Sequence, residues 1–217
     1  MNNARKNIPG ILLLFLVFIG SCNHQEVSTL PFYNTPDLTP VWIKQDASEY
    51  DQIHTIADFN FVDQNGNQVT EENFKDKIYV ADFFFTTCPG ICTKLTNNMT
   101  MLQEEFKSDD DILLLSHSVT PEMDSMSQLK EYAQTKGVLD NKWFLVTGDR
   151  DHIYDMARNA YFADDEFGFQ KNENSFLHTE NFILIDKQRR IRGIYNGTLP
   201  FDVKRLIEDI RILKEEG

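Results

Sequence analysis

The chain alternates between apolar runs that suit buried strands and amphipathic stretches that suit helices. Residues 56–62 and 68–70 predict the two strands of a hairpin, because the turn-forming residues 63–67 (Asp-Gln-Asn-Gly-Asn) separate them. Residues 78–85 are apolar except for Asp82, which is typical of a central buried strand. Further strands are predicted over residues 112–119, 144–146, 181–186 and 190–195.

Helices are predicted between these strands. Over residues 90–107 the apolar side chains recur every three or four positions, so one helical face is apolar. A second helix begins at Ser125 and ends at Gly137, and two more are predicted over 151–160 and 201–215. Strands alternating with helices, followed by a hairpin and a closing helix, predict an α/β fold.

The N-terminus has the features of an export signal. Arg5 and Lys6 precede the apolar run 11–19, which is shorter than the roughly 20 residues that span a bilayer. The sequence from Ile19 to Cys22 (Ile-Gly-Ser-Cys) resembles the lipobox of bacterial lipoproteins. That resemblance implies that residues 1–21 are removed, that Cys22 is acylated, and that the protein is held on the membrane, facing the periplasm or the exterior. An ordinary cleaved signal or an uncleaved anchor is the alternative.

Residues 22–53 are predicted to be a tether and residues 54–217 the folded domain. Pro31, Pro36 and Pro40 prevent a long helix in the tether, although residues 40–43 could dock on the domain as a short strand. The chain carries 34 acidic and 21 basic residues and a net charge of −13. This acidity argues against nucleic acid or anionic lipid as the principal partner.

Cysteine usage points to chemistry at one turn. The chain has three cysteines, and if Cys22 carries lipid only Cys88 and Cys92 remain. A bridge across four residues would close a very short loop and stabilise little. Both thiols lie where the strand 78–85 passes into the helix 90–107, and the helix dipole there is expected to lower both thiol pKa values. Cys88, which precedes the helix, is expected to be the more exposed. Two buried structural cysteines are the alternative reading.

The stretch from Asp82 to Cys92 (Asp-Phe-Phe-Phe-Thr-Thr-Cys-Pro-Gly-Ile-Cys) resembles the signature of the Sco/SenC family of copper chaperones. Residues 118–124, 148–151 and 178–186 resemble further family segments in the same order, over roughly residues 54 to 215. Thr120 and Met123 depart from the family pattern. The resemblance implies a thioredoxin-like fold, a central mixed β-sheet flanked by helices with an N-terminal β-hairpin extension. It also implies copper bound by Cys88, Cys92 and His178.

On residue type alone, several histidines are candidate ligands. The resemblance selects His178, which lies just before a predicted strand, whereas His117 lies within an apolar strand and is expected to be a core residue. The remaining histidines are His24, His54 and His152. Two thiolates and one imidazole form a soft set that suits copper, as Cu(I) or Cu(II), better than four-coordinate zinc. Met123 and Met126 are expected to fill gaps rather than to bind metal.

Three functions follow as alternatives. The resemblance implies delivery of copper to the subunit of cytochrome c oxidase that carries the CuA centre, or reduction of that subunit's cysteines before loading. A thiol-disulfide oxidoreductase using Cys88 and Cys92 as a redox-active pair is the rival, supported by Asp82, a carboxylate in an apolar strand whose pKa burial should raise. Against it, three residues rather than two separate the thiols, and residues 178–181, just before the strand that faces the cysteines, contain no proline. A scaffold lipoprotein without chemistry at the cysteines is the third.

Overall fold

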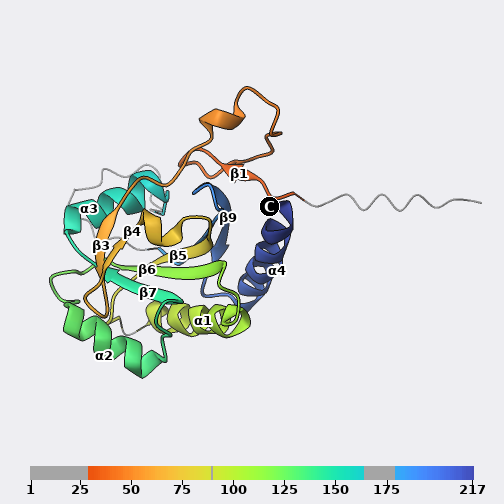
Figure 1. Ribbon diagram of the computed structural model, residues 1–217. Coiled ribbons are helices and arrows are strands. Elements are labelled where there is room, and N and C mark those ends of the chain that lie inside the picture. Colours follow the sequence, from red (N-terminus) through yellow and green to blue (C-terminus); the bar gives the residue numbers. More distant parts are fainter. Residues whose placement is uncertain (1–28, 89, 164–178) are drawn as a thin grey trace, which may run out of the picture.

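The computed structural model describes residues 29–88, 90–163 and 179–217, and a seven-stranded mixed sheet is its centre (Figure 1). The strand order is β4-β3-β7-β6-β5-β8-β9. The buried strand β5 pairs in parallel with β6 on one side and antiparallel with β8 on the other. The strands are β3 (Asn60–Asp63), β4 (Gln68–Thr70), β5 (Ile78–Phe84), β6 (Ile112–Ser118), β7 (Trp143–Thr147), β8 (Asn181–Ile185) and β9 (Ile191–Asn196).

Helices cover both faces of this sheet. One face packs against α1 (Ile91–Phe106), α2 (Met126–Lys136) and α4 (Pro200–Glu216). The other face packs against α3 (Arg150–Asp155), which continues into a π-helical turn over Met156–Ala160. The predicted helix 151–160 is therefore two segments. Short 3-10 turns lie at Tyr50–Gln52 and Glu71–Phe74.

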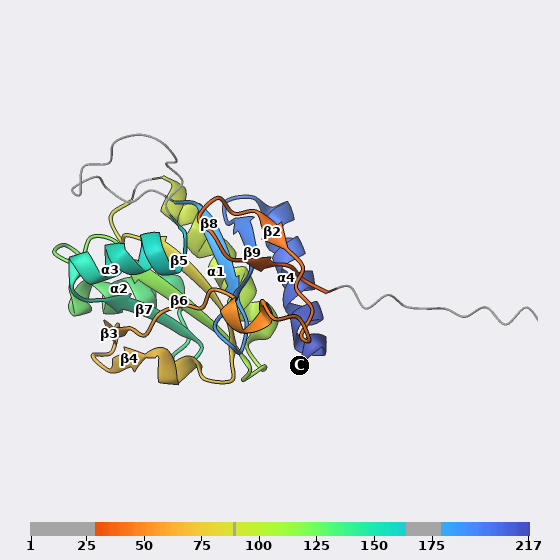
Figure 2. The same ribbon diagram turned by 90° about the horizontal axis from the view of Figure 1, so that it is seen from above.

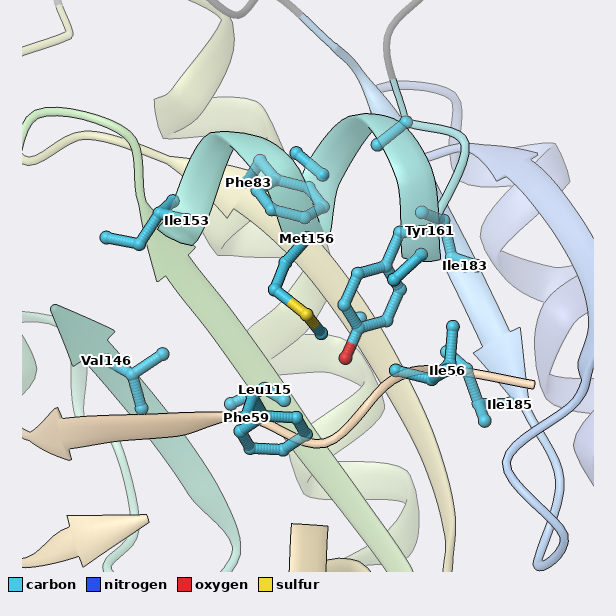
Figure 3. Close-up of a cluster of buried hydrophobic side chains, with 14 of the residues drawn as sticks. Ile56, Phe59, Phe83, Leu115, Val146, Ile153, Met156, Tyr161, Ile183 and Ile185 are labelled. Carbon is cyan, nitrogen blue, oxygen red and sulfur yellow. The ribbon is translucent and has the colours of Figure 1, made fainter. Parts of the chain in front are cut away.

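The side chains of β5 and β6 alternate between these two faces, as the pleat of a strand requires. Tyr79, Ala81 and Phe83 point toward α3, into the buried cluster shown in Figure 3. Ile78, Val80 and Phe84 point toward α1 and α4. By the same alternation Asp82 lies on the α1 face. The mixed sheet is flanked by helices, and the hairpin β3–β4 forms its last two strands on one side. Both features agree with the sequence prediction.

Residues 29–53, the described part of the predicted tether, lie against the sheet and α4. Strands β1 (Phe32–Tyr33) and β2 (Pro40–Val41) form a small antiparallel sheet, so the possible docking strand predicted at 40–43 is present as β2. The Arg192 guanidinium donates to the carbonyl oxygens of Leu30 and Pro31 and to the Glu216 carboxylate at 2.6–3.1 Å. This arginine therefore joins the start of the described chain to the end of α4.

Candidate metal and thiol site

The site lies at one edge of the sheet, where several strands and helices begin or end. Because β5, β6, β7 and β9 all run in the same direction, their carboxyl ends share this edge with the start of β8. Figure 2 shows that α1 and α4 also begin there. The residues between β5 and α1 carry Cys88, and Cys92 lies in the first turn of α1.

Cys88 and Cys92 differ in exposure, although they are one helical turn apart. Cys88 is half-buried and Cys92 is buried, as expected from their order along the chain, and both are free thiols. The backbone amide of Cys92 donates to the sulfur of Cys88 at 3.4 Å. The more accessible sulfur therefore receives the unpaired donors of the helix N-terminus.

The two thiols also differ in pKa. Burial opposes ionisation of Cys88, but hydrogen bonds from the Cys92 thiol and from the backbone amides of residues 90–92 lower the pKa of Cys88 below its ordinary value. Burial, the hydrogen bond to Cys88, and the charges of Cys88 and Asp82 raise the pKa of Cys92 to about 12. The expectation that the helix dipole lowers both pKa values is wrong for Cys92, because desolvation of a buried thiolate outweighs the dipole.

Asp82 is a buried carboxyl on the same face of the sheet. It accepts a hydrogen bond from the Ser116 hydroxyl, which in turn accepts one from the Trp143 indole nitrogen at 2.8 Å. Burial raises the pKa of Asp82 to about 7, although the Ser116 hydrogen bond opposes the shift. The predicted direction of this shift is confirmed. Asp82 is therefore a proton-binding group near neutral pH within electrostatic reach of Cys92.

The loop that precedes Cys88 is held by Asp124, which is fully buried. Its carboxylate accepts from the Thr86 backbone amide at 3.2 Å and from the Thr86 hydroxyl at 2.5 Å. It also accepts from the Ser118 and Thr120 hydroxyls at 2.6 and 3.1 Å. Asp124 thus joins the end of β6 to the chain two residues before Cys88.

A second polar contact supports the first turn of α1. The Thr96 hydroxyl donates to the Cys92 carbonyl at 2.8 Å and lies 2.6 Å from the Tyr132 hydroxyl on α2. Burial raises the pKa of Tyr132 to about 12, with smaller contributions from the negative charges of Asp82 and the two thiols. Tyr132 is therefore a neutral hydroxyl beside the cysteines over the physiological pH range.

Comparison with protein families decides the relationship of this chain. The SCO1/SenC family model matches residues 47–215. The chain belongs to the SCO1/SenC family. A solved SCO1/SenC family lipoprotein from Bacillus anthracis str. Ames has a TM-score of 0.65 and 29% sequence identity, over 74% of this chain and 95% of that one. A second solved structure is BsSco, described as a member of the Sco family of cytochrome c oxidase assembly proteins with a disulfide switch. Its TM-score is 0.61 and its sequence identity 27%, over 74% of this chain and 93% of that one.

The SCO1/SenC fold is thioredoxin-like, as expected. The copper-bound structure of Bradyrhizobium japonicum ScoI also shares it, with a TM-score of 0.58 and 22% identity over 73% of this chain and 99% of that one. Within residues 29–88, 90–163 and 179–217 no helix combines the length and apolar character needed to cross a bilayer.

In this SCO1/SenC chain the predicted site residues fall into two groups. Cys88 and Cys92 are brought together, whereas Cys22 and His178 lie outside the described residues. Thr179, the residue after His178, is two positions before β8 and therefore at the same edge as the cysteines. Among the described residues no group of three or more His, Cys, Asp or Glu side chains could hold a metal ion.

His117 and His54 lie in contacts that belong to the packing of the fold. His117 is buried among Phe61, Phe83 and Tyr161, and burial lowers its pKa to about 3. Its Nε2 has no hydrogen-bond partner among the described residues, so the expected core histidine is only partly satisfied. His54 contacts the Ala160 carbonyl at 2.8 Å. His24 lies outside the described residues.

Some residues of the site were not identified from sequence. Asp124, Ser116 and Tyr132 each hold part of it, yet each is a polar residue whose partners are distant in the chain. The available signal was weak: Ser116 interrupts the apolar run of β6 on the same face as Asp82. Met123 and Met126, expected to fill gaps, are instead exposed at 60% and 48%.

A large cleft lies elsewhere, between the N-terminal segment and the end of α4. Its volume is about 920 Å³, and Leu30, Trp42, Arg190 and Leu213 are among its lining residues. Both arginines that line it form ion pairs within the chain, Arg190 with Asp186 and Arg192 with Asp186 and Glu216. Cys88 and Cys92 lie toward the opposite end of α4, so this cleft is separate from the candidate site.

Proposed function

We propose that this chain binds one copper ion through Cys88, Cys92 and His178 and delivers it to the cytochrome c oxidase subunit that carries the CuA centre. The observation that carries the proposal is the pair of thiols at the start of α1. One is accessible and has a lowered pKa, and the other is buried one turn away. Family membership and the copper-bound and oxidase-assembly descriptions of related proteins support the choice of metal and target.

The donor set favours copper over zinc. Two thiolates and an imidazole are soft ligands, and Cu(I) accepts three of them, whereas a structural zinc site takes four protein ligands. The high pKa of Cys92 means that copper must displace a proton from this thiol, so binding should release protons and strengthen as pH rises. A three-coordinate ion retains an open position, through which a ligand of the receiving protein can enter.

Anaerobic copper titration of the reduced domain tests this proposal. We expect one tightly bound ion in the wild type and loss of tight binding in Cys88→Ser, Cys92→Ser and His178→Ala. His54→Ala is the matched control, since His54 contacts the Ala160 carbonyl and should leave copper binding unchanged. Tight stoichiometric binding by His178→Ala would reject His178 as a ligand.

A second function, thiol-disulfide exchange, is favoured by the unequal pKa values of the two thiols. The Cys88 thiolate would attack one sulfur of a partner disulfide and release the other as a thiolate. Cys92 would then lose its proton and attack the Cys88 sulfur, which frees the partner as a dithiol and leaves Cys88 and Cys92 oxidised. Asp82, whose charge acts on Cys92, is the buried group suited to accept that proton.

The two functions separate on one variant. Copper delivery requires all three ligands, whereas disulfide exchange requires only the two thiols. His178→Ala should therefore abolish copper transfer to the reduced target while leaving reduction of the oxidised target's disulfide intact. Rapid reduction of insulin by the wild type without tight copper binding would favour the oxidoreductase.

Membrane attachment through lipid on Cys22 is part of the proposal. The Bacillus anthracis relative is described as a lipoprotein, which supports this reading of residues 19–22. Mass spectrometry of the mature protein should find acylated Cys22 at the N-terminus. Cys22→Ala should release the protein from membranes, and an unmodified N-terminus would contradict the assignment.

A further inference from the structure

Large apolar side chains are exposed on both sides of Cys88. Ile91 is 41% exposed, Met123 60%, Leu199 51% and Phe201 79%. We call these four residues the apolar rim. Exposed apolar side chains gathered at one edge are typical of a surface that docks a partner.

Sheet topology places the four residues around the same turn. Cys88 follows β5, Met123 follows the neighbouring strand β6, and Leu199 and Phe201 follow β9, which lies two strands from β5 on the other side. Adjacent strands are about 4.8 Å apart, so the ends of β5 and β9 are roughly 10 Å apart. The rim therefore fits within the ~800 Å² that each partner contributes to an ordinary protein interface.

Contacts beside the rim residues hold these elements together. On one side, Gly197 approaches α1: a Cβ there would meet Leu95 at 2.7 Å, and the Asn98 side chain donates to its carbonyl at 2.6 Å. Leu95 is one helical turn from Ile91, and Leu199 is two residues from Gly197. On the other side, Asp124, next to Met123, holds Thr86 just before Cys88.

We propose that the apolar rim is the docking surface for the protein that exchanges copper or electrons with Cys88, a folded domain with an apolar collar around its own cysteines. This inference rests on the proposed function. Either exchange requires a partner atom to bond with the Cys88 sulfur, which is half-buried in its turn. A folded partner can approach that closely only by pressing against the residues that surround the turn, and the large exposed side chains among them are those of the apolar rim.

The rim should act on affinity and leave the copper site itself unchanged. Leu199→Ser and Phe201→Ser remove apolar area and touch no proposed ligand. The probe is the purified soluble CuA-carrying domain of the oxidase subunit, and the measurements are its Kd for the chain and the rate of copper transfer at limiting concentration. We expect the double variant to bind about 10-fold more weakly or worse, as for loss of interface anchors. Copper stoichiometry and copper affinity of the chain alone should equal those of the wild type.

Leu139→Ser is the matched control, because Leu139 is 42% exposed but lies between α2 and β7, at the opposite edge of the sheet. Equal Kd values for wild type, the rim variant and this control would overturn the inference, as would equal weakening by both substitutions. If the wild type transfers no copper, the proposed function fails, and the docking inference is judged by binding of the same domain to the copper-free chain. Binding that the rim variant alone weakens supports it, and absence of binding overturns it.

Discussion

The backbone nitrogen of Cys92 lies 3.4 Å from the sulfur of Cys88, so the helix N-terminus donates directly to the thiol that precedes it. Cys92 contributes its amide and its thiol to the same acceptor, while its own sulfur is buried. This one-directional arrangement lowers the pKa of Cys88 and favours its thiolate, while the raised pKa of Cys92 favours the protonated thiol. The two cysteines are therefore suited to different roles.

Selective alkylation should reveal this asymmetry. At pH 7 iodoacetamide should modify Cys88 and spare Cys92, because only the thiolate reacts and the pKa of Cys92 is raised to about 12. Cys92→Ala should slow the reaction of Cys88 by raising its pKa, since the thiol hydrogen bond is lost. Peptide mapping and thiolate absorbance against pH provide the measurement. Faster modification of Cys92 than of Cys88 would contradict the structure.

Asp82 should make stability depend on pH. The pKa of Asp82 is raised from 3.8 to about 7, so between about pH 4 and 7 the folded protein holds a proton that the unfolded chain releases. The contribution of Asp82 to the free energy of unfolding is therefore most favourable at low pH. It falls as pH rises through that window, by at most about 1.4 kcal/mol per pH unit. Urea unfolding of Asp82→Asn should show a weaker fall, and hence a more stable protein than wild type at pH 8.

The exposed Asp110 is the control for that comparison, because Asp110→Asn removes an equal charge without a buried carboxyl. Asp110→Asn should keep the pH dependence of the wild type between pH 4 and 7. Identical pH profiles for wild type and Asp82→Asn would show that the buried carboxyl does not retain its proton.

Removing the Asp124 carboxylate should destabilise the domain and loosen the turn that carries Cys88. Asp124→Ala leaves the Thr86 amide and three hydroxyl groups without their acceptor, which should cost about 3 kcal/mol in the free energy of unfolding. Hydrogen exchange at residues 86–88 should increase. Glu122→Ala, on the same loop, loses only a partly exposed ion pair with Arg150 and should cost less than about 1 kcal/mol.

Arg192 should hold the N-terminal segment on the domain. Arg192→Met removes its donors to the Leu30 and Pro31 carbonyls and leaves Asp186 and Glu216 with fewer partners. We expect faster proteolysis within residues 29–53 and a loss of about 3 kcal/mol in stability. Arg211→Met, whose partner Glu105 is exposed, is the control. Unchanged proteolysis of the segment would show that other contacts hold it.

Local sequence patterns were sufficient for most elements. The apolar run 78–85 corresponds to β5, and the predicted helix 90–107 corresponds to α1. Ser125 caps α2 by accepting from the Gln128 amide, and Gly137, with φ +70°, ends it in a conformation that glycine adopts without strain. These features were predictable because periodicity, capping and turn chemistry act over a few residues.

The composition of the candidate site was also visible in the sequence, since Cys88, Cys92 and Asp82 lie within one strand-turn-helix stretch. The structure alone decided what each group does. Desolvation separates the pKa values of the two thiols, and Asp124 and Tyr132 reach this region from the loop after β6 and from α2. Burial and long-range hydrogen bonds depend on which strands are neighbours, and a linear pattern of residues carries no direct record of that.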